Sequence, residues 1–129
     1  MIVLAQEYVA FDSALQLLES IIRAVEHMHQ RKRLHGDIKP LNLVRMPDGT
    51  WRVIDLDAVV RFLETVGAKD LSTAYAPPEA TLVKTEEKRI VFRVPRQVDE
   101  KDVLVAHPTF DIWSLGVIMF MALSRRSLF

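Results

Sequence analysis

Two short apolar runs, residues 43–46 and 51–54, limit most strongly how this chain can fold. Pro47, Asp48 and Gly49 stand between them, and these residue types favour tight turns. Strand-like runs around such a turn predict a β-hairpin. Because a hairpin returns the chain to its starting point, the residues just before and just after it must lie close together.

Polar side chains flank both ends of this predicted hairpin. Asp37, Lys39 and Asn42 precede it, and Asp55 and Asp57 follow it. Phosphoryl transfer needs an acid to orient the attacking hydroxyl, a cation to offset charge on the moving group, and oxygen ligands for magnesium. Carboxylate and amide oxygens suit Mg²⁺ better than zinc. The residues themselves therefore favour a phosphotransferase site.

Two helices are predicted, over about residues 13–30 and over residues 111–123. In the first, apolar residues recur at helical spacing after Asp12 or Ser13, either of which can cap the helix. This stripe consists of Leu15, Leu18, Ile22, Val25 and Met28, widened by Leu17 and Ile21. The second helix is apolar almost all round, which is typical of a buried helix.

The remaining segments give weaker signals. Residues 59–72 are expected to be irregular, Pro77 and Pro78 suit the first turn of a short helix, and residues 90–94 resemble a strand. A mixture of helices and short hairpins of this kind predicts an α+β fold.

Composition excludes several classes of function. Seventeen Lys and Arg residues balance seventeen Asp and Glu residues, so no overall field attracts nucleic acid or a membrane surface. The absence of cysteine excludes disulfides and thiolate metal sites. Neither a secretory signal nor an apolar segment long enough to cross a membrane is visible, so we expect a cytoplasmic protein. The oligomeric state cannot be predicted.

The segment before the hairpin resembles the catalytic loop of eukaryotic protein kinases, whose pattern is H-R-D-L-x-x-x-N. His35, Asp37 and Asn42 match it at the right spacing, and Lys39 matches the lysine of Ser/Thr-type kinases. The resemblance implies that Asp37 is the catalytic base, that Lys39 contacts the transferred phosphate, and that Asn42 binds magnesium. His35 would pack in the family's internal hydrophobic spine.

The resemblance extends into the hairpin and beyond it. Asp55 to Asp57 occupies the D-F-G place, which implies that Asp55 is the main magnesium ligand, and Val44 would lie under the adenine ring. Ser72 matches a hydroxyl residue that touches the catalytic Asp and Lys. These matches imply ATP and Mg²⁺ as cofactors and a protein substrate.

Two later motifs follow in the order expected for the family. Tyr75 to Glu79 resembles the end of the activation segment, usually A-P-E, and Asp111 to Gly116 resembles the start of a buried helix whose Asp braces the catalytic loop. The predicted fold is therefore kinase-like. Residues 1–129 would form part of the mainly helical C-lobe, from about helix E to helix F.

Several positions depart from the family pattern. Gly36 replaces an arginine that normally binds a phosphorylated activation-loop residue, so we expect activity without that phosphate. Asp57 replaces the glycine of D-F-G, which is either tolerated or a sign of lost activity. The segment between Glu79 and Asp111 is longer than usual, which predicts a surface insertion or, less simply, a docking strand.

The sequence contains no glycine-rich phosphate loop and no strand lysine before the first helix. We therefore expect residues 1–129 alone to be marginally stable and to bind ATP poorly. In the second helix, Ile118, Phe120 and Leu123 would be partly uncovered.

Two other functions remain open. Aminoglycoside and choline kinases share H-G-D-x-x-x-x-N followed by I-D-x-D/E, which Gly36 and residues 54–57 also fit. Lys39 and the two later motifs do not fit that group. A pseudokinase acting as an interaction module is the other alternative, although such a module has no need of the whole set of polar residues.

Overall fold

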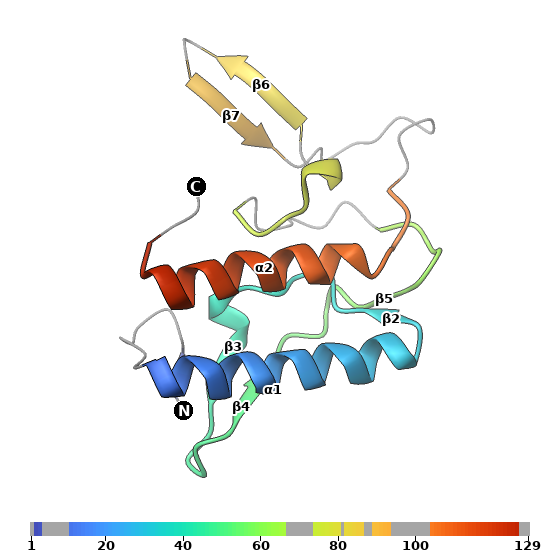
Figure 1. Cartoon of the computed structure of the whole chain (residues 1–129). Coiled ribbons are helices and arrows are strands. Elements are labelled where there is room, and N and C mark those ends of the chain that lie inside the picture. Colours follow the sequence, from blue (N-terminus) through green and yellow to red (C-terminus); the bar gives the residue numbers. More distant parts are fainter. Residues whose placement is uncertain are drawn as a thin grey trace.

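The structure, a computed structural model, describes residues 2–3, 11–66, 74–80, 82–86, 89–93 and 104–126 (Figure 1). In chain order its elements are β1 (Ile2–Val3), α1 (Phe11–Gln30), β2 (Arg33–Leu34), the 3₁₀ helix η2 (Pro40–Asn42), β3 (Leu43–Arg45), β4 (Trp51–Val53), β5 (Val60–Arg61), the 3₁₀ helix η3 (Pro78–Ala80), β6 (Leu82–Glu86), β7 (Arg89–Arg93) and α2 (Thr109–Ser124).

The predicted hairpin is confirmed as β3 and β4. The two strands are antiparallel, with Leu43 opposite Val53 and Arg45 opposite Trp51. Its turn is closed by Gly49 N–H, which donates to the Met46 carbonyl at 2.9 Å. Strand β1 pairs with the other edge of β3, so β3 is central in a three-stranded sheet.

The first predicted helix is also confirmed, although it begins at Phe11. The predicted stripe is wider than the buried face, because Leu15 and Ile22 are 49% and 52% exposed. The predicted residues Leu17, Leu18, Ile21 and Val25 do reach the core, together with Ala14, which was not predicted. Periodicity thus identified most of the face that packs but not where that face ends.

Helices α1 and α2 lie side by side, with the β3–β4 hairpin packed against α1 (Figure 1). The main core joins Leu17 and Ile21 of α1 to Trp51 of β4 and Ile118 of α2. Burial of this apolar surface is the main force that holds the helices against the hairpin.

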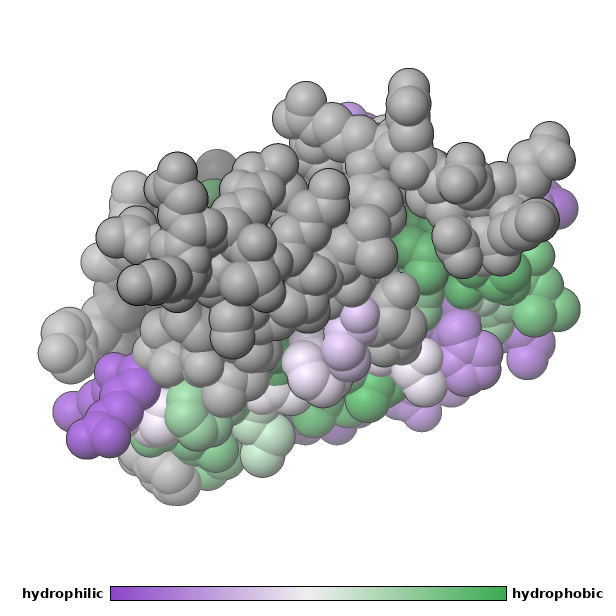
Figure 2. Space-filling view, turned by 90° about the horizontal axis from the view of Figure 1, so that it is seen from above, coloured by the Kyte–Doolittle hydropathy of each residue, from purple (hydrophilic) through white to green (hydrophobic). Residues whose placement is uncertain are grey.

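The composition of α2 predicted a helix that is buried on all sides. In the structure only one side is buried. One face contains the buried Phe110, Asp111, Ser114, Val117 and Ile118, and the opposite face exposes Ile112, Met119, Phe120 and Leu123 by 41–55%. Phe120 and Leu123 are thus partly uncovered as expected, whereas Ile118 is only 1% exposed because it packs into the main core. In a view from above, hydrophobic residues (green) lie between hydrophilic ones (purple) along the edge of the molecule (Figure 2).

The segment after the hairpin is more regular than predicted. Within residues 59–66, β5 pairs antiparallel with β2, and Thr65 forms a bridge with Val105. Leu34 of β2 forms a second small core with Ala106 and Phe110, and Val60 of β5 packs against it. Residues 67–73 lie outside the described part of the chain.

Two further expectations have outcomes in the structure. The short helix predicted at Pro77 and Pro78 is the 3₁₀ helix η3, and the strand predicted over residues 90–94 is β7. Its partner β6 was not predicted; the two form a separate two-stranded sheet. Helices with small antiparallel strand pairs confirm the α+β class. No helix in the described residues combines the length and apolar character needed to cross a bilayer.

Candidate active site

A short loop between β2 and η2 carries most of the predicted site. Leu34 at the end of β2 and Ile38 in the loop are 0% and 1% exposed, so apolar anchors hold the loop from two sides. Asp37 and Lys39, on either side of Ile38, are only partly buried. The loop therefore has a fixed backbone and presents polar groups at its surface.

Asp37 is held by two of the residues predicted to act with it. Lys39 Nζ donates to Asp37 Oδ2 at 2.6 Å, and Asn42 Nδ2 donates to the same oxygen at 3.2 Å and to the Asp37 carbonyl at 2.8 Å. The side chains of Asp37 and Lys39 are 15% and 20% exposed. These contacts fix one carboxylate oxygen of Asp37, and charge-assisted hydrogen bonds of this kind are stronger than neutral ones.

Asp55 is brought to the same region by the hairpin. Ile54 N–H donates to the Asn42 carbonyl at 2.9 Å, so the backbone just before Asp55 is bonded to Asn42. Asp55 is exposed and has the left-handed φ of +66°, which is uncommon for a residue other than glycine. Aspartate tolerates this region better than most residue types.

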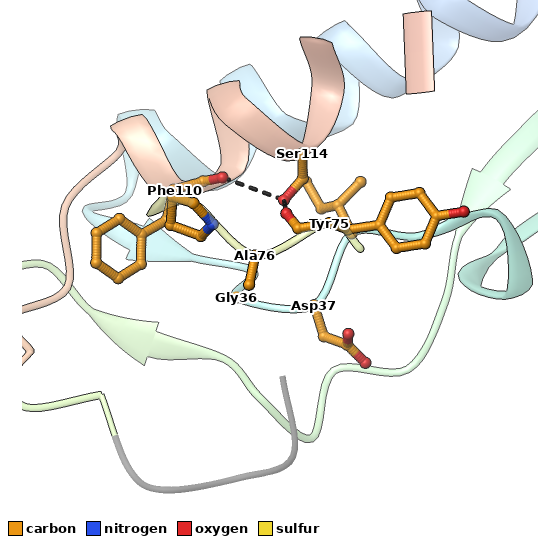
Figure 3. Close-up of a pocket in the computed structure, with 8 residues that line it drawn as sticks. Gly36, Asp37, Tyr75, Ala76, Phe110 and Ser114 are labelled. Carbon is orange, nitrogen blue, oxygen red and sulfur yellow. Dashed lines mark hydrogen bonds between the residues drawn. The ribbon is translucent and has the colours of Figure 1, made fainter. Parts of the chain in front are cut away.

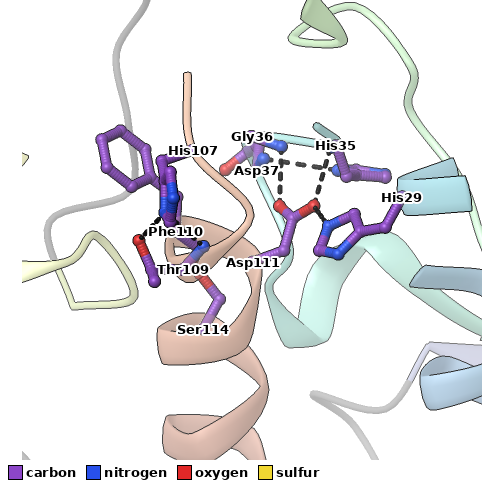
Figure 4. A network of polar contacts seen from close by, with 9 residues as sticks. All are labelled: His29, His35, Gly36, Asp37, His107, Thr109, Phe110, Asp111 and Ser114. Carbon is purple, nitrogen blue, oxygen red and sulfur yellow. Dashed lines mark hydrogen bonds and ion pairs between the residues drawn. The ribbon is translucent and has the colours of Figure 1, made fainter. Parts of the chain in front are cut away.

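Asp111 connects α2 to the loop (Figure 4). Its Oδ2 accepts hydrogen bonds from the His35 N–H at 2.9 Å and from His29 Nε2 at 2.8 Å, and its Oδ1 accepts one from the Gly36 N–H at 3.0 Å. The residue is 1% exposed. A buried carboxylate with three donors holds two consecutive amides of the loop in place.

His29 was not predicted to take part in the site. The signal that could have found it is its position four residues after the buried Val25, because residues four apart share a face of a helix. A histidine on the buried face of a helix needs a polar partner, and here the partner is Asp111.

The backbone conformation and close packing at position 36 favour glycine over any residue with a side chain. The φ of Gly36 is +81°, and a Cβ added there would lie 2.9 Å from the carbonyl oxygen of Ala58. His35 beside it is fully buried; its Nδ1 accepts from the Asp37 N–H at 3.3 Å. The loop is thus closely packed against the segment that follows Asp55.

A pocket opens beside Asp37, between the loop, α2 and the segment around Tyr75 (Figure 3). Ser114 Oγ of α2 lies 2.8 Å from the Tyr75 carbonyl, to which it donates, and this contact fixes the segment beside Asp37. Burial raises the pKa of the Tyr75 hydroxyl above its ordinary value. The predicted activation-segment motif therefore forms one wall of a pocket at the candidate catalytic acid.

Comparison with known proteins decides the family. A sequence model of the protein kinase domain matches residues 2–129. The chain belongs to the protein kinase family. The Carbon catabolite-derepressing protein kinase of Candida glabrata is 29% identical over 113 residues, which cover 88% of this chain and 16% of the relative.

Other kinases show similar likeness. The protein of the same name from Saccharomyces cerevisiae is 29% identical over 113 residues, covering 88% of this chain and 15% of that protein. The Meiosis-specific serine/threonine-protein kinase mek1 of Schizosaccharomyces pombe is 31% identical over 118 residues, covering 89% of this chain and 25% of that protein. The chain therefore spans a quarter or less of the length of these relatives.

Within this kinase chain, three predicted site residues have no described contact with the Asp37 region. Val44 is fully buried in the central strand β3, so its role under an adenine ring remains a prediction. Ser72 lies outside the described residues. Glu79 is in η3, but its side chain is outside the described part.

The donor set suits magnesium. Asn42 Nδ2 is committed to Asp37, which leaves the amide oxygen to bind a cation, and the Asp55 carboxylate is exposed. Hard oxygen donors of this type are the ligands that Mg²⁺ uses together with water and phosphate oxygens. Among the described residues no group of three histidine or acidic side chains could hold a metal alone.

Proposed function

We propose that the protein containing this chain transfers the γ-phosphate of ATP to serine or threonine hydroxyls of a protein substrate. The observation that carries the proposal is the contact of Lys39 Nζ with Asp37 Oδ2 at 2.6 Å, in a loop held by Asp111. An acid and a cation fixed together beside a pocket suit the transfer of a charged group to a neutral hydroxyl.

Asp37 orients the attacking hydroxyl in this proposal. Lys39 and Asn42 both bond to Oδ2, so Oδ1 is the oxygen available to accept the hydrogen of the substrate hydroxyl. The Lys39 ammonium also offsets negative charge on the phosphoryl group as it moves. Because the side chains are held before substrate binds, little reorganisation is needed during the reaction.

Asn42 and Asp55 would hold magnesium at the hairpin end of the site. When bound, the ion neutralises charge on the phosphate oxygens. The hydrogen bond from Ile54 N–H to the Asn42 carbonyl holds these two ligands near each other, because it connects the residue before Asp55 directly to Asn42.

Two observations support serine and threonine as acceptors. Lys39 stands where kinases of the Ser/Thr type have a lysine, and one similar protein, mek1, is named a serine/threonine-protein kinase. Gly36 supplies no guanidinium for a phosphorylated activation segment, so activity should not require such a phosphate.

The experiment compares Asp37→Asn with the parent protein in its native full-length form. Magnesium-dependent transfer of labelled phosphate from ATP to a degenerate serine/threonine peptide library should fall at least about a thousandfold in the variant. Asp48→Asn is the matched control, since Asp48 is an exposed turn acid away from the loop.

Equal activity of Asp37→Asn and the parent would contradict the assigned role. Transfer to an aminoglycoside rather than to peptides would favour the small-molecule alternative. A parent protein that binds partners but transfers no phosphate would favour the interaction module.

A further inference from the structure

His29 makes two contacts that belong to different parts of the kinase. Its Nε2 lies 2.8 Å from Asp111 Oδ2, and its ring lies edge-on to the ring of Phe62, with centroids 5.3 Å apart and planes at 70°. His29 is in α1, Asp111 is in α2, and Phe62 follows β5. One side chain therefore joins three elements that are distant in sequence.

The contact with Asp111 leads directly to the catalytic loop. Asp111 Oδ2 accepts from both His29 and the His35 N–H, and Oδ1 accepts from the Gly36 N–H. Since the backbone amides can only donate, Asp111 is the acceptor, and His29 supplies the hydrogen through Nε2. The His29 side chain is 15% exposed and that of Asp111 is 1% exposed, so water competes weakly for this bond.

The contact with Phe62 leads to the segment that begins at Asp55. Phe62 is held in place by its own N–H, which donates to the Lys32 carbonyl at 3.0 Å, and by packing on the second small core. An edge-to-face arrangement of two rings is favourable and restricts the orientation of both. The orientation of the His29 ring, and hence of its Nε2–H, therefore depends on Phe62.

We propose that His29 is a positioning residue that couples the segment after Asp55 to the catalytic loop without a phosphate. Gly36 has no side chain that could receive a phosphorylated residue, so a charge-based link at that position is absent. The chain from Phe62 through His29 to Asp111 provides a link made of ring packing and one hydrogen bond. This inference rests on the proposed function for its effect on catalysis, but not for its effect on the loop.

The test uses three variants of the full-length protein. His29→Phe keeps a ring against Phe62 and removes the donor to Asp111. His29→Gln keeps a donor and removes the ring, and Phe62→Leu removes the aromatic edge. His27→Gln is the matched control, because His27 is an exposed histidine of the same helix that contacts only the Arg31 side chain among the described residues.

Hydrogen exchange of peptides containing the His35 and Gly36 amides is the first measurement. His29→Phe should speed their exchange about tenfold, the effect of losing one hydrogen bond to a carboxylate. Phe62→Leu should speed it about threefold, consistent with loss of a ring contact, but should add nothing in the His29→Gln background. His29→Gln should stay within about threefold of the parent, and the control should match the parent.

Kinase activity is the second measurement. In His29→Phe, kcat should fall about tenfold with an unchanged KM for ATP, because the loop is misplaced while the nucleotide contacts are intact. His29→Gln should recover most of that loss.

Three results would overturn the inference. The first is His29→Phe with the exchange rates and kcat of the parent, and the second is a Phe62→Leu/His29→Gln double variant in which the two effects on exchange multiply. The third is exchange in His29→Phe that speeds up equally at the core residues Ile21 and Val25. The last result would show general loss of stability rather than loss of a specific link. If the amides respond as expected while the parent transfers no phosphate, the link stands and the proposed function fails.

Discussion

Substitutions at three glycines can show how much of the destabilisation caused by a side chain at Gly36 comes from its left-handed backbone and how much from close packing. Gly36 and Gly49 have nearly the same left-handed φ, +81° and +84°, but only Gly36 lies against another backbone. A Cβ at Gly36 would meet the Ala58 carbonyl oxygen at 2.9 Å, whereas a Cβ at Gly49 would have no neighbour within 4 Å. Gly116 lies inside α2, also without a neighbour within 4 Å.

The expected free energies of unfolding follow from these surroundings. Gly49→Ala should destabilise by about 1 kcal/mol, the cost of placing an L-residue in left-handed backbone. Gly36→Ala bears the same cost, and the backbone near Ala58 must also move, so we expect a total of about 2–3 kcal/mol. Gly116→Ala should stabilise by up to about 1 kcal/mol, because alanine favours a helix interior.

Urea unfolding of the purified full-length protein and the three variants, followed by circular dichroism, measures these differences. Equal losses for Gly36→Ala and Gly49→Ala would refute the argument that close approach to Ala58 determines the residue at position 36. Gly36→Ala should also lower phosphotransfer, since the displaced segment begins at Asp55, whereas Gly49→Ala should not.

Three further predictions concern other parts of the structure. Asp111→Asn should lower the free energy of unfolding by about 2–3 kcal/mol in urea titrations, because an amide cannot accept at both of its ends and leaves at least one loop amide unpaired. Leu17→Ala, at a fully buried core position, should cost about 3 kcal/mol in the same assay. The Thr50 hydroxyl lowers the pKa of Asp48, so Thr50→Val should raise that pKa in an NMR titration. A carboxyl group whose pKa is lower in the folded state than in the unfolded state stabilises the fold at pH values above its ordinary pKa. This stabilisation is lost as the pH falls through the lowered pKa. Because the variant lacks it from the start, its free energy of unfolding should fall less below about pH 4.

The parts of the site that are close in sequence could be predicted from it. Asp37, Lys39 and Asn42 lie within six residues, and the turn signal at Gly49 predicted the hairpin that brings Asp55 to them. Local patterns determine local geometry, so these predictions needed no knowledge of long-range packing.

The parts that depend on distant contacts could not be predicted in the same way. His29 and Asp111 are 82 residues apart, and neither residue type signals the other. Strand β5 has two residues, too few for any alternation to be visible. The edge of the buried face of α1 was also missed: Leu15 and Ile22 were included although they are exposed, because periodicity does not show how far the partner surfaces reach around a helix.

Trp51 gives the hairpin an intrinsic optical probe. Its indole is 6% exposed and packs in the main core, opposite Arg45 on β3, so its emission should shift to longer wavelength when the hairpin leaves α1. The chain contains only one other tryptophan, Trp113 in α2. A Trp113→Phe background would therefore let unlabelled protein report, in real time, whether the strands that join the two halves of the active site stay docked while nucleotide and magnesium are added.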